Sequence, residues 1–266
     1  MSDDVTAPAV LTERRGNVSV ITLNRPEARN AINQAVSTAL GDALHAAQLD
    51  PEVRAVIITG AGDKSFCAGA DLKAISRREN IFHPDHPEWG FAGYVRHFID
   101  KPTIAAVNGT ALGGGTELAL ASDLIVAEES ARFGLPEVKR GLLAAAGGVF
   151  RIVDHLPRKV ALELLFTGEP ISAADALRWG LINKVVPDGA VVEGALALAE
   201  RITGNAPLAV SATKRVAYGV DDGVITGDET GWGRTMSEMG ALLKSEDAKE
   251  GPRAFAEKRP PVWTAR

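Results

Sequence analysis

Hydrophobic positions along the chain switch repeatedly between the two-residue period of a strand and the longer period of a helix. Residues 10–24 alternate around a turn at Gly16, which predicts a β-hairpin. Apolar side chains recur at helical spacing over residues 30–49, and residues 53–59 form an almost continuous apolar run, as in a strand buried on both faces. This succession predicts an α/β fold in which helices cover parallel strands.

The same periodicities continue along the rest of the chain. Further strands are predicted at residues 103–107, 124–127 and 181–186. Further helices are predicted to begin near residues 71, 114 and 148, and to cover residues 91–99 and 161–166. Beyond Val191 the pattern is mainly helical, in segments that reach residue 217 and cover residues 229–243 and 246–257. We therefore expect an α/β core in residues 1–190 and a helical region in residues 191–266.

The central stretch, residues 102–123, combines a strand, a glycine-rich turn and a helical pattern. The apolar strand leads through Asn108 into three consecutive glycines, residues 113–115, and a helix that carries Glu117. N–H groups in the first turn of a helix have no intrahelical acceptor, and with the helix dipole they attract negative charge. Glu117 would add a candidate acid or base beside them. Taken alone, these residues favour the structural interpretation, a tight turn that packs a helix closely on a sheet, over a functional site.

Composition narrows the classes of function. With 45% hydrophobic and 24% charged residues, the 266-residue chain matches a soluble globular protein. A net charge of −5 argues against a polyanionic main partner. Cys67 is the only cysteine, which fits a reducing compartment, and residues 1–10 lack the basic and apolar regions of a secretory signal. No apolar run approaches the roughly 20 residues of a membrane-spanning helix. We expect a cytoplasmic protein that binds neither membranes nor nucleic acid.

Two histidines, His83 and His86, raise the question of a metal site. They lie in the least regular segment, residues 74–100, which prolines interrupt and which has no accompanying cluster of acidic residues or cysteines. An ordinary polar loop is therefore the better interpretation, and we predict no metal. The position of this loop after the candidate site favours a lid or a wall of the substrate pocket.

Several motifs occur in a fixed order along the chain. They are residues 24–31 (NRPEARNA), 58–62 (ITGAG), 66–72 (FCAGADL), 106–119 (AVNGTALGGGTELA), 133–137 (FGLPE) and 245–259 (SEDAKEGPRAFAEKR). Together they resemble the crotonase family, the enoyl-CoA hydratase/isomerase superfamily. The similarity spans about residues 10–263, and it is the combination that is specific, because each motif alone would be weak.

The resemblance implies a spiral of ββα turns followed by a C-terminal helical region that makes trimer contacts, often in a hexamer built as a dimer of trimers. It also implies an acyl-CoA thioester as substrate, so that coenzyme A is part of the substrate and no separate cofactor is needed. By motif match, the backbone N–H groups of Ala70 and Gly114 form the oxyanion hole. Glu117 and Glu137 correspond to the two catalytic glutamates of the hydratases.

The resemblance further implies where coenzyme A lies. The residues along its arm are Ala68, Ala70, Asp71 and Leu72. Two cations, Lys64 and Lys258, are placed by the matching motifs to meet its phosphates. The alternative for this pair is two solvated surface lysines.

Hydration explains why these residue types are needed. Adding water to an α,β-unsaturated thioester puts negative charge on the thioester oxygen in the transition state. Fixed N–H donors stabilise that charge, and losing one typically costs about 2.7–4 kcal/mol. Glycine at position 114 lets the backbone approach closely. Two carboxylates then divide the proton transfers. By resemblance, Glu117 activates the water that attacks Cβ and Glu137 supplies the proton to Cα.

The presence of both glutamates favours hydration over the other chemistries of the superfamily. Branches that isomerise, dehalogenate or cyclise commonly keep the oxyanion hole but replace one or both acids. Residues 141–148 also lack the proline and the acidic residue that many members carry before the paired glycines, which argues against aspartate-based chemistry. They leave a small, apolar surface near residues 144–146. A general enoyl-CoA hydratase is therefore the first hypothesis.

Two alternatives to a general hydratase stay open. Residues 89–93, 176–180 and 257–263 resemble the carnitinyl-CoA dehydratase branch, which applies the same chemistry to a trimethylammonium substrate. Trp89, Phe82 and Phe91 could supply an aromatic face for such a cation, but a plain acyl chain would suit them equally. Some relatives of this fold bind RNA through a lysine-rich first helix. Residues 30–49 contain no lysine or arginine, which disfavours that function.

Overall fold

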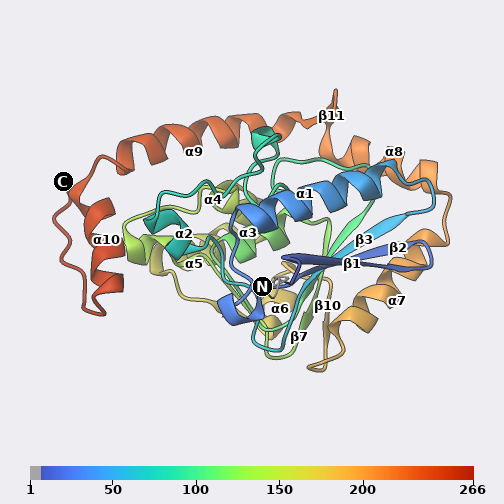
Figure 1. Ribbon diagram of the computed structural model, residues 1–266, viewed down its shortest axis with the longest axis horizontal. Helices are drawn as coiled ribbons and strands as arrows, with labels where there is room; N and C mark the ends of the chain where they lie inside the picture. Colours follow the sequence, from blue (N-terminus) through green and yellow to red (C-terminus); the bar gives the residue numbers. More distant parts are fainter. Residues whose placement is uncertain (1–6) are drawn as a thin grey trace, which may run out of the picture.

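A computed structural model describes residues 7–266, so most of the stretch tested for a secretory signal lies outside the described part. The larger of its two main sheets has six strands in the order β1-β2-β3-β5-β7-β10 (Figure 1). These strands are Val10–Arg15, Val18–Leu23, Ala55–Gly60, Thr103–Val107, Leu124–Glu128 and Lys184–Val186. β1 and β2 form the predicted antiparallel hairpin, and all other neighbours in this sheet run parallel. The predicted parallel strands are confirmed.

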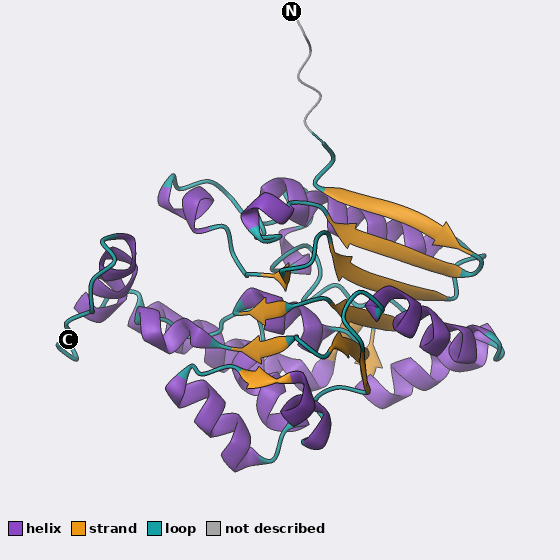
Figure 2. Cartoon of the chain, turned by 90° about the horizontal axis from the view of Figure 1, so that it is seen from below, coloured by secondary structure: helices purple, strands orange, loops and turns teal. Residues whose placement is uncertain are grey.

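A second sheet has four short strands in the order β4-β6-β8-β9 (Figure 2). They are Ser65–Cys67, Thr110–Leu112, Arg132–Gly134 and Ile171–Ser172. The chain therefore spirals: a strand of the large sheet leads into one of the small sheet and then into a helix. The first two turns are β3-β4-α2 and β5-β6-α3, with α2 at Leu72–Ser76 and α3 at Gly114–Ala121. β7 and β8 repeat the step and lead to α4, Gly148–His155. The predicted spiral of ββα turns is confirmed.

Two buried layers hold the spiral together. α1, Gln34–Leu49, packs a face that contains Val36, Leu40 and Leu44 into the main core, and the Asn33 side chain caps its first turn. The opposite face of the large sheet packs against α7, Val191–Thr203. Neighbouring residues of one strand therefore lie in different cores, which explains why these strands are apolar on both faces.

The helix predicted over residues 91–99 is wrong. This segment consists of turns, preceded by the 3-10 helix η2, Pro87–Trp89. Gly90 and Gly93 have φ angles of 74° and 64°, which a helix excludes. A β-carbon on Gly93 would lie 2.3 Å from the carbonyl oxygen of Ser37 on α1. The loop therefore packs tightly on α1. Its apolar side chains enter the core at the spacing of a helix, although its backbone is not helical.

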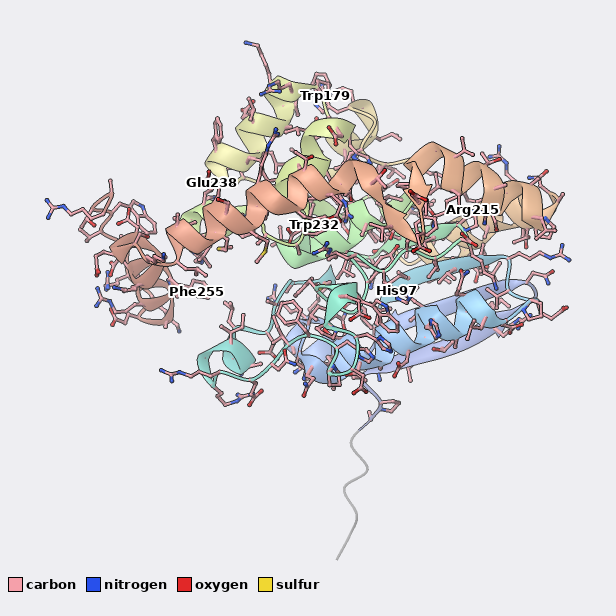
Figure 3. The ribbon with its side chains drawn as sticks, turned by 90° about the horizontal axis from the view of Figure 1, so that it is seen from above. His97, Trp179, Arg215, Trp232, Glu238 and Phe255 are labelled. Atoms are coloured by element: carbon pink, nitrogen blue, oxygen red, sulfur yellow. The ribbon has the colours of Figure 1, made fainter. Side chains whose placement is uncertain are left out.

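Stacked rings fasten the same loop. Trp89 lies between His86 and His97, with ring centroids 4.0 Å and 3.9 Å away. Gly41 makes room on α1, because a β-carbon there would lie 2.8 Å from the indole of Trp89. His97 belongs to the loop seen at the centre of Figure 3. This packing fixes residues 83–97 on the outside of α1.

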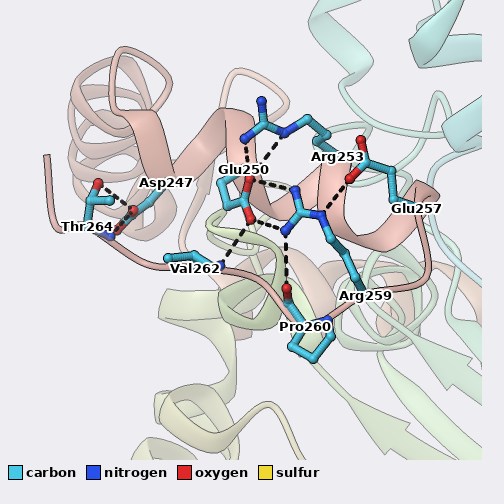
Figure 4. A network of polar contacts seen from close by, with 8 residues as sticks. All are labelled: Asp247, Glu250, Arg253, Glu257, Arg259, Pro260, Val262 and Thr264. Carbon is cyan, nitrogen blue, oxygen red and sulfur yellow. Dashed lines mark hydrogen bonds and ion pairs between the residues drawn. The ribbon is translucent and has the colours of Figure 1, made fainter.

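The remaining helices follow the sheets. α5 is Arg158–Thr167 and α6 is Ala173–Arg178. After α7 come α8 (Pro207–Tyr218) and the short hairpin of β11 (Val220–Asp221) and β12 (Val224–Ile225). α9 (Glu229–Leu242) and α10 (Glu246–Ala256) follow. α10 contacts the 3-10 helix η3, Pro136–Arg140. In Figure 4 the carboxylate of Glu250 on α10 binds Arg253, Arg259 and the amide of Val262, which ties the last residues to this helix. Among residues 7–266, no helix combines the length and apolar character needed to cross a bilayer.

Candidate active site

The site forms where the glycine-rich turn enters α3. Gly113 is the residue before the helix and has a φ of 55°, which an L-residue with a side chain adopts only at a cost. Its N–H donates to the carbonyl of Gly134 at 2.9 Å. Thr116 bonds the carbonyls of Ala111 and Gly134, so β6 and β8 are held against the first turn. The sequence thus places the start of a buried helix at the ends of two strands of the small sheet.

Two backbone N–H groups come together beside this turn. A β-carbon on Gly69 would lie 3.0 Å from the nitrogen of Gly114, so residues 68–71 lie directly against the start of α3. Ile32 bonds the backbone of Gly69 and Asp71 on either side of Ala70. In such a parallel bridge the N–H of Ala70 points away from Ile32. Gly114, the first residue of α3, has no intrahelical acceptor. Within residues 7–266, neither the Ala70 nor the Gly114 N–H has a hydrogen-bond partner.

Glu117 is held at the other side of the turn. It is 3% exposed, and its Oε1 accepts hydrogen bonds from the amides of Ala146 at 2.7 Å and Gly148 at 2.9 Å. Burial raises the pKa of Glu117 to about 8, and the charge of Glu137 adds to this rise. The two amides and Arg151 act in the opposite direction but do not cancel it. The carboxyl group is therefore fixed in place and able to exchange a proton near neutral pH.

Glu137 approaches from η3. Its Oε1 lies 2.8 Å from the position that a β-carbon on Gly113 would occupy, so the carboxylate rests on the turn itself. The residue is half-buried, yet its Oε2 is fully buried and has no partner among the described residues. Burial raises the pKa of Glu137 to about 7. An unpartnered, buried carboxylate oxygen is unusual, and it is expected where a substrate group completes the site.

The two glutamates form an electrostatically coupled pair, although twenty residues separate them in sequence. Since each charge disfavours the other, the pair holds a single proton over part of the neutral pH range. One carboxylate can then accept a proton while the other donates one. Chemically, two unpaired N–H groups beside such a pair are able to combine electrostatic stabilisation with acid–base catalysis in the same small volume.

Comparison with known proteins agrees with this geometry. A family model described as enoyl-CoA hydratase/isomerase matches residues 13–266. The chain belongs to the enoyl-CoA hydratase/isomerase family. A carnitinyl-CoA dehydratase from Salmonella typhi is 45% identical over 258 residues, which cover 95% of this chain and 97% of that protein.

Solved structures of this family are also similar. The crystal structure of a carnitinyl-CoA hydratase from Mycobacterium avium superposes with a TM-score of 0.97 at 77% identity, covering 98% of this chain and 100% of that one. An enoyl-CoA hydratase from Mycobacterium tuberculosis H37Rv gives a TM-score of 0.76 at 44% identity over the same shares. The predictions of the family, the crotonase fold and a hydratase are thereby confirmed.

The residues expected along coenzyme A differ in exposure. Ala68 is exposed, and Leu72, at the start of α2, is 55% exposed. Asp71 is buried instead: its Oδ1 caps α2 by accepting from the amides of Lys73 and Ala74, and its Oδ2 pairs with Arg25 at 3.0 Å. Burial is the largest influence on the pKa of Asp71 and acts upward, but these hydrogen bonds and the Arg25 charge together lower it. The Asp71 side chain thus positions the loop that carries Ala70.

The two lysines predicted to meet the phosphates lie on separate segments. Lys64 is exposed in the loop between β3 and β4, and its carbonyl accepts the amide of Thr110. Lys258 is exposed just after α10, the helix that contacts η3 and therefore the segment of Glu137. Their role remains a prediction, as do the roles of the glutamates and the two N–H groups.

Sequence patterns alone missed two features of the site, the amides that hold Glu117 and the side chain of Arg151, and they named Phe91 only as a possible aromatic face. Ala146 and Gly148 hold Glu117 through amides, which no side-chain motif can reveal, although the paired glycines did predict the start of α4. Phe91 lies against the turn at Gly113 and Gly114, because a β-carbon on Gly114 would lie 2.5 Å from its ring. Arg151 acts on Glu117 from α4.

The histidine pair has a different environment from a metal site. The Nδ1 of His83 accepts the amides of Asp85 and His86, and its Nε2 lies 3.2 Å from the carboxylate of Asp42. Both ring nitrogens are thus used in local contacts. No group of three or more metal-ligating side chains occurs in the part of the chain from residue 7 onward.

Proposed function

We propose that this protein adds water reversibly to the double bond of a trans-2-enoyl-CoA thioester to give a 3-hydroxyacyl-CoA. The observation that carries this proposal is the coupled pair of buried glutamates with pKa values of about 8 and about 7 beside two unpaired N–H groups. Hydration needs one proton acceptor, one proton donor and a stabiliser for negative charge on oxygen. The site contains all three.

The N–H groups of Ala70 and Gly114 bind the thioester oxygen. In the singly protonated pair the proton lies mainly on Glu117, whose pKa is the higher, and it moves to Glu137 to give the reacting form. Ionised Glu117 then takes a proton from water as the water oxygen bonds to Cβ, and the electron pair of the double bond moves onto the thioester to form an enolate. Protonated Glu137 then delivers its proton to Cα. The sum of these steps is the addition of one water, and a proton returns from Glu117 to Glu137, through solvent or product exchange, before the next turnover. Glu117 suits the water because two amides hold it in one orientation.

A second candidate substrate is crotonobetainyl-CoA, whose hydration gives carnitinyl-CoA. The relative from Mycobacterium avium at 77% identity and the relatives from Salmonella are named for carnitinyl-CoA. Phe91, against the turn at Gly114, offers an aromatic face near the reacting atoms. A neutral enoyl chain fits the same face, and it remains the first candidate.

The test is a panel of enoyl-CoA thioesters that differ in length and charge, with crotonyl-CoA and crotonobetainyl-CoA as the matched pair. Loss of the enoyl absorbance in wild-type protein, abolished in Glu117→Gln and in Glu137→Gln, supports hydration. A kcat/KM higher for crotonobetainyl-CoA by about tenfold or more would assign the carnitinyl substrate. No turnover of any member would overturn the proposal.

We further propose that the enzyme works as a trimer or hexamer in the cytoplasm, with no cofactor beyond the coenzyme A of its substrate. Support comes from the extended C-terminal region, in which Met236 on α9, Leu243 directly after α9 and Phe255 on α10 expose apolar side chains, as expected of a surface that another subunit covers. Light scattering at micromolar concentration should give three or six times the monomer mass. A stable, active monomer, or activity lost on treatment with a chelator, would contradict these proposals.

A further inference from the structure

Among residues 7–266, Arg151 is the buried cation that acts on the glutamate pair, and the mechanism above does not use it. It lies on α4, one turn after the Gly147–Gly148 step, and is 9% exposed. Its backbone N–H bonds the carbonyl of Gly147, and its guanidinium folds back over the same turn. We propose that Arg151 is a positioning residue for Glu117, holding the 146–148 turn and setting the electrostatic potential at the carboxylate.

The guanidinium is fixed from two distant parts of the chain. Its Nη2 donates to Asp228 at 2.7 Å and to the carbonyl of Val95 at 2.9 Å, and its Nε donates to Asp228 at 3.2 Å. Asp228 stands at the start of α9, and Val95 follows Phe91 in the loop on α1. Arg151 therefore joins α4, the start of α9 and the loop of residues 83–97 at one point. Its planar, five-donor group suits such a junction better than a lysine would.

The contact with the catalytic turn runs through Gly147. This glycine lies between Ala146 and Gly148, whose amides hold Glu117, and its φ is 99°. A β-carbon on Gly147 would lie 3.2 Å from Nη1 of Arg151 and 3.2 Å from the indole of Trp232. Trp232 projects from α9 toward the body of the protein (Figure 3). The turn is thus enclosed between Glu117 and a layer formed by the guanidinium and the indole.

The charge of Arg151 also reaches the carboxylate. It lowers the pKa of Glu117, against the rise caused by burial and by Glu137. These two side chains, Glu137 from η3 and Arg151 from α4, are the charged groups that act on Glu117. Asp228 partly neutralises the guanidinium through its ion pair. Removing Arg151 and removing the charge of Asp228 should therefore shift the titration of Glu117 in opposite directions.

Opposite shifts in the pKa of Glu117 distinguish a positioning role of Arg151 from a purely structural role. The Nη1 atom of Arg151 is buried and has no hydrogen-bond partner within residues 7–266. Hydrogen bonds alone therefore do not explain why the guanidinium is buried beside this turn. A clamp without an electrostatic role would loosen in the same way when either partner of the Arg151–Asp228 pair is removed. The inference rests on the proposed hydration, in which Glu117 exchanges a proton with water.

The experiment compares Arg151→Met, Asp228→Asn and Arg151→Lys with wild type. Arg151→Met should move the limb of the kcat/KM–pH profile governed by Glu117 to higher pH by about one unit, as removal of a nearby charge in a protein interior does. Asp228→Asn should move it to lower pH. Arg151→Lys should keep this limb of the pH profile at its wild-type position, because lysine keeps the positive charge. Its kcat should be lower by roughly tenfold, because lysine lacks the planar guanidinium that bonds several acceptors at once. Arg96→Met is the control, since Arg96 also stacks on Trp232, at 5.0 Å, but pairs with Glu229 instead of Asp228.

A second readout does not need turnover. Difference infrared titration of the carboxyl stretch, assigned by its loss in Glu117→Gln, should show the same opposite shifts in Arg151→Met and Asp228→Asn. Shifts in one direction, or none, in variants with wild-type circular dichroism would overturn the inference. If wild type hydrated no enoyl-CoA while the infrared shifts were opposite, the proposed function would fail and the electrostatic role of Arg151 would stand.

Discussion

The Oε1 atom of Glu137 lies 2.8 Å from the point where a β-carbon on Gly113 would stand. Any side chain at position 113 would therefore displace the carboxylate. Gly113 also has a φ of 55°, so two independent constraints demand glycine there. The turn that frees the N–H of Gly114 is thus the same turn that sets the position of Glu137.

Replacing Gly113 with alanine should lower kcat by about 10²-fold, since a displacement of about 1 Å at a reacting group has that effect. The matched control is Gly16→Ala, at a φ of 59° with no atom within 4 Å of the new β-carbon. Gly113 combines its φ with a ψ of −125°, which lies outside the left-handed helical region, so Gly113→Ala should lose more stability in urea unfolding than Gly16→Ala, and kcat is compared between the folded variants. Equal activities in the two variants would show that Glu137 does not need its contact with Gly113.

Replacing either Glu117 or Glu137 with glutamine should lower kcat by about 10²–10⁴-fold, because each removes one proton transfer and keeps the size of the side chain. The double variant should lose less than the product of the two factors, since the pair works as a unit. Calorimetry should show that all three variants still bind a CoA ester, because the contacts proposed for its thioester are backbone N–H groups. Wild-type turnover of crotonyl-CoA by Glu137→Gln would exclude the two-glutamate mechanism.

The pH profile of kcat/KM should be bell-shaped with its maximum between about pH 7 and 8. The pKa of Glu137 is raised to about 7 and that of Glu117 to about 8, so the singly protonated pair is most populated in this interval. Because the charge of Glu137 raises the pKa of Glu117, Glu137→Gln should move the remaining limb to lower pH. A profile flat from pH 6 to 9 would contradict the assignment of both groups.

Glu117→Gln should stabilise the protein at alkaline pH while it inactivates it. The pKa of Glu117 is about 8 in the folded protein against an ordinary 4.5, so the folded state binds the extra proton. The associated stability is fully present below about pH 4.5 and is lost as the pH rises to about 8. Urea unfolding at pH 5 and pH 9 should show a gain for the variant at pH 9 on the order of a few kcal/mol. Exposed Glu163→Gln on α5 should show no such difference, and the same result for Glu117→Gln would indicate an ordinary carboxyl.

Neutralising Lys64 and Lys258 together should raise KM for CoA esters by about three- to tenfold at low salt, with little change in kcat, because a surface charge contributes uniform binding. The effect should fade in 0.5 M salt. Lys184→Ala, at an exposed position on β10, is the control. An unchanged KM in the double variant would remove both lysines from the phosphate site.

The sequence by itself determined the layered α/β fold, most of its elements and the pairing of a glycine-rich turn with Glu117. These features are local, since apolar periodicity, glycines and caps are read within about twenty residues. The motifs around Ala70 and Glu137 identified the family through their order along the chain. The one wrong helix, over residues 91–99, shows the limit: its apolar spacing came from packing on α1, which a local pattern cannot separate from a helix.

Only the tertiary structure decided the chemistry of the site. Glu117 is a surface residue or a buried acid depending on what covers α3, and its raised pKa comes from burial and from Glu137, twenty residues away. The amides of Ala146 and Gly148, the ring of Phe91 and the guanidinium of Arg151 reach the turn from separate elements. Desolvation and Coulomb interactions depend on distances between segments remote in sequence, so the local pattern fixed which residues were available and the packing fixed what they do.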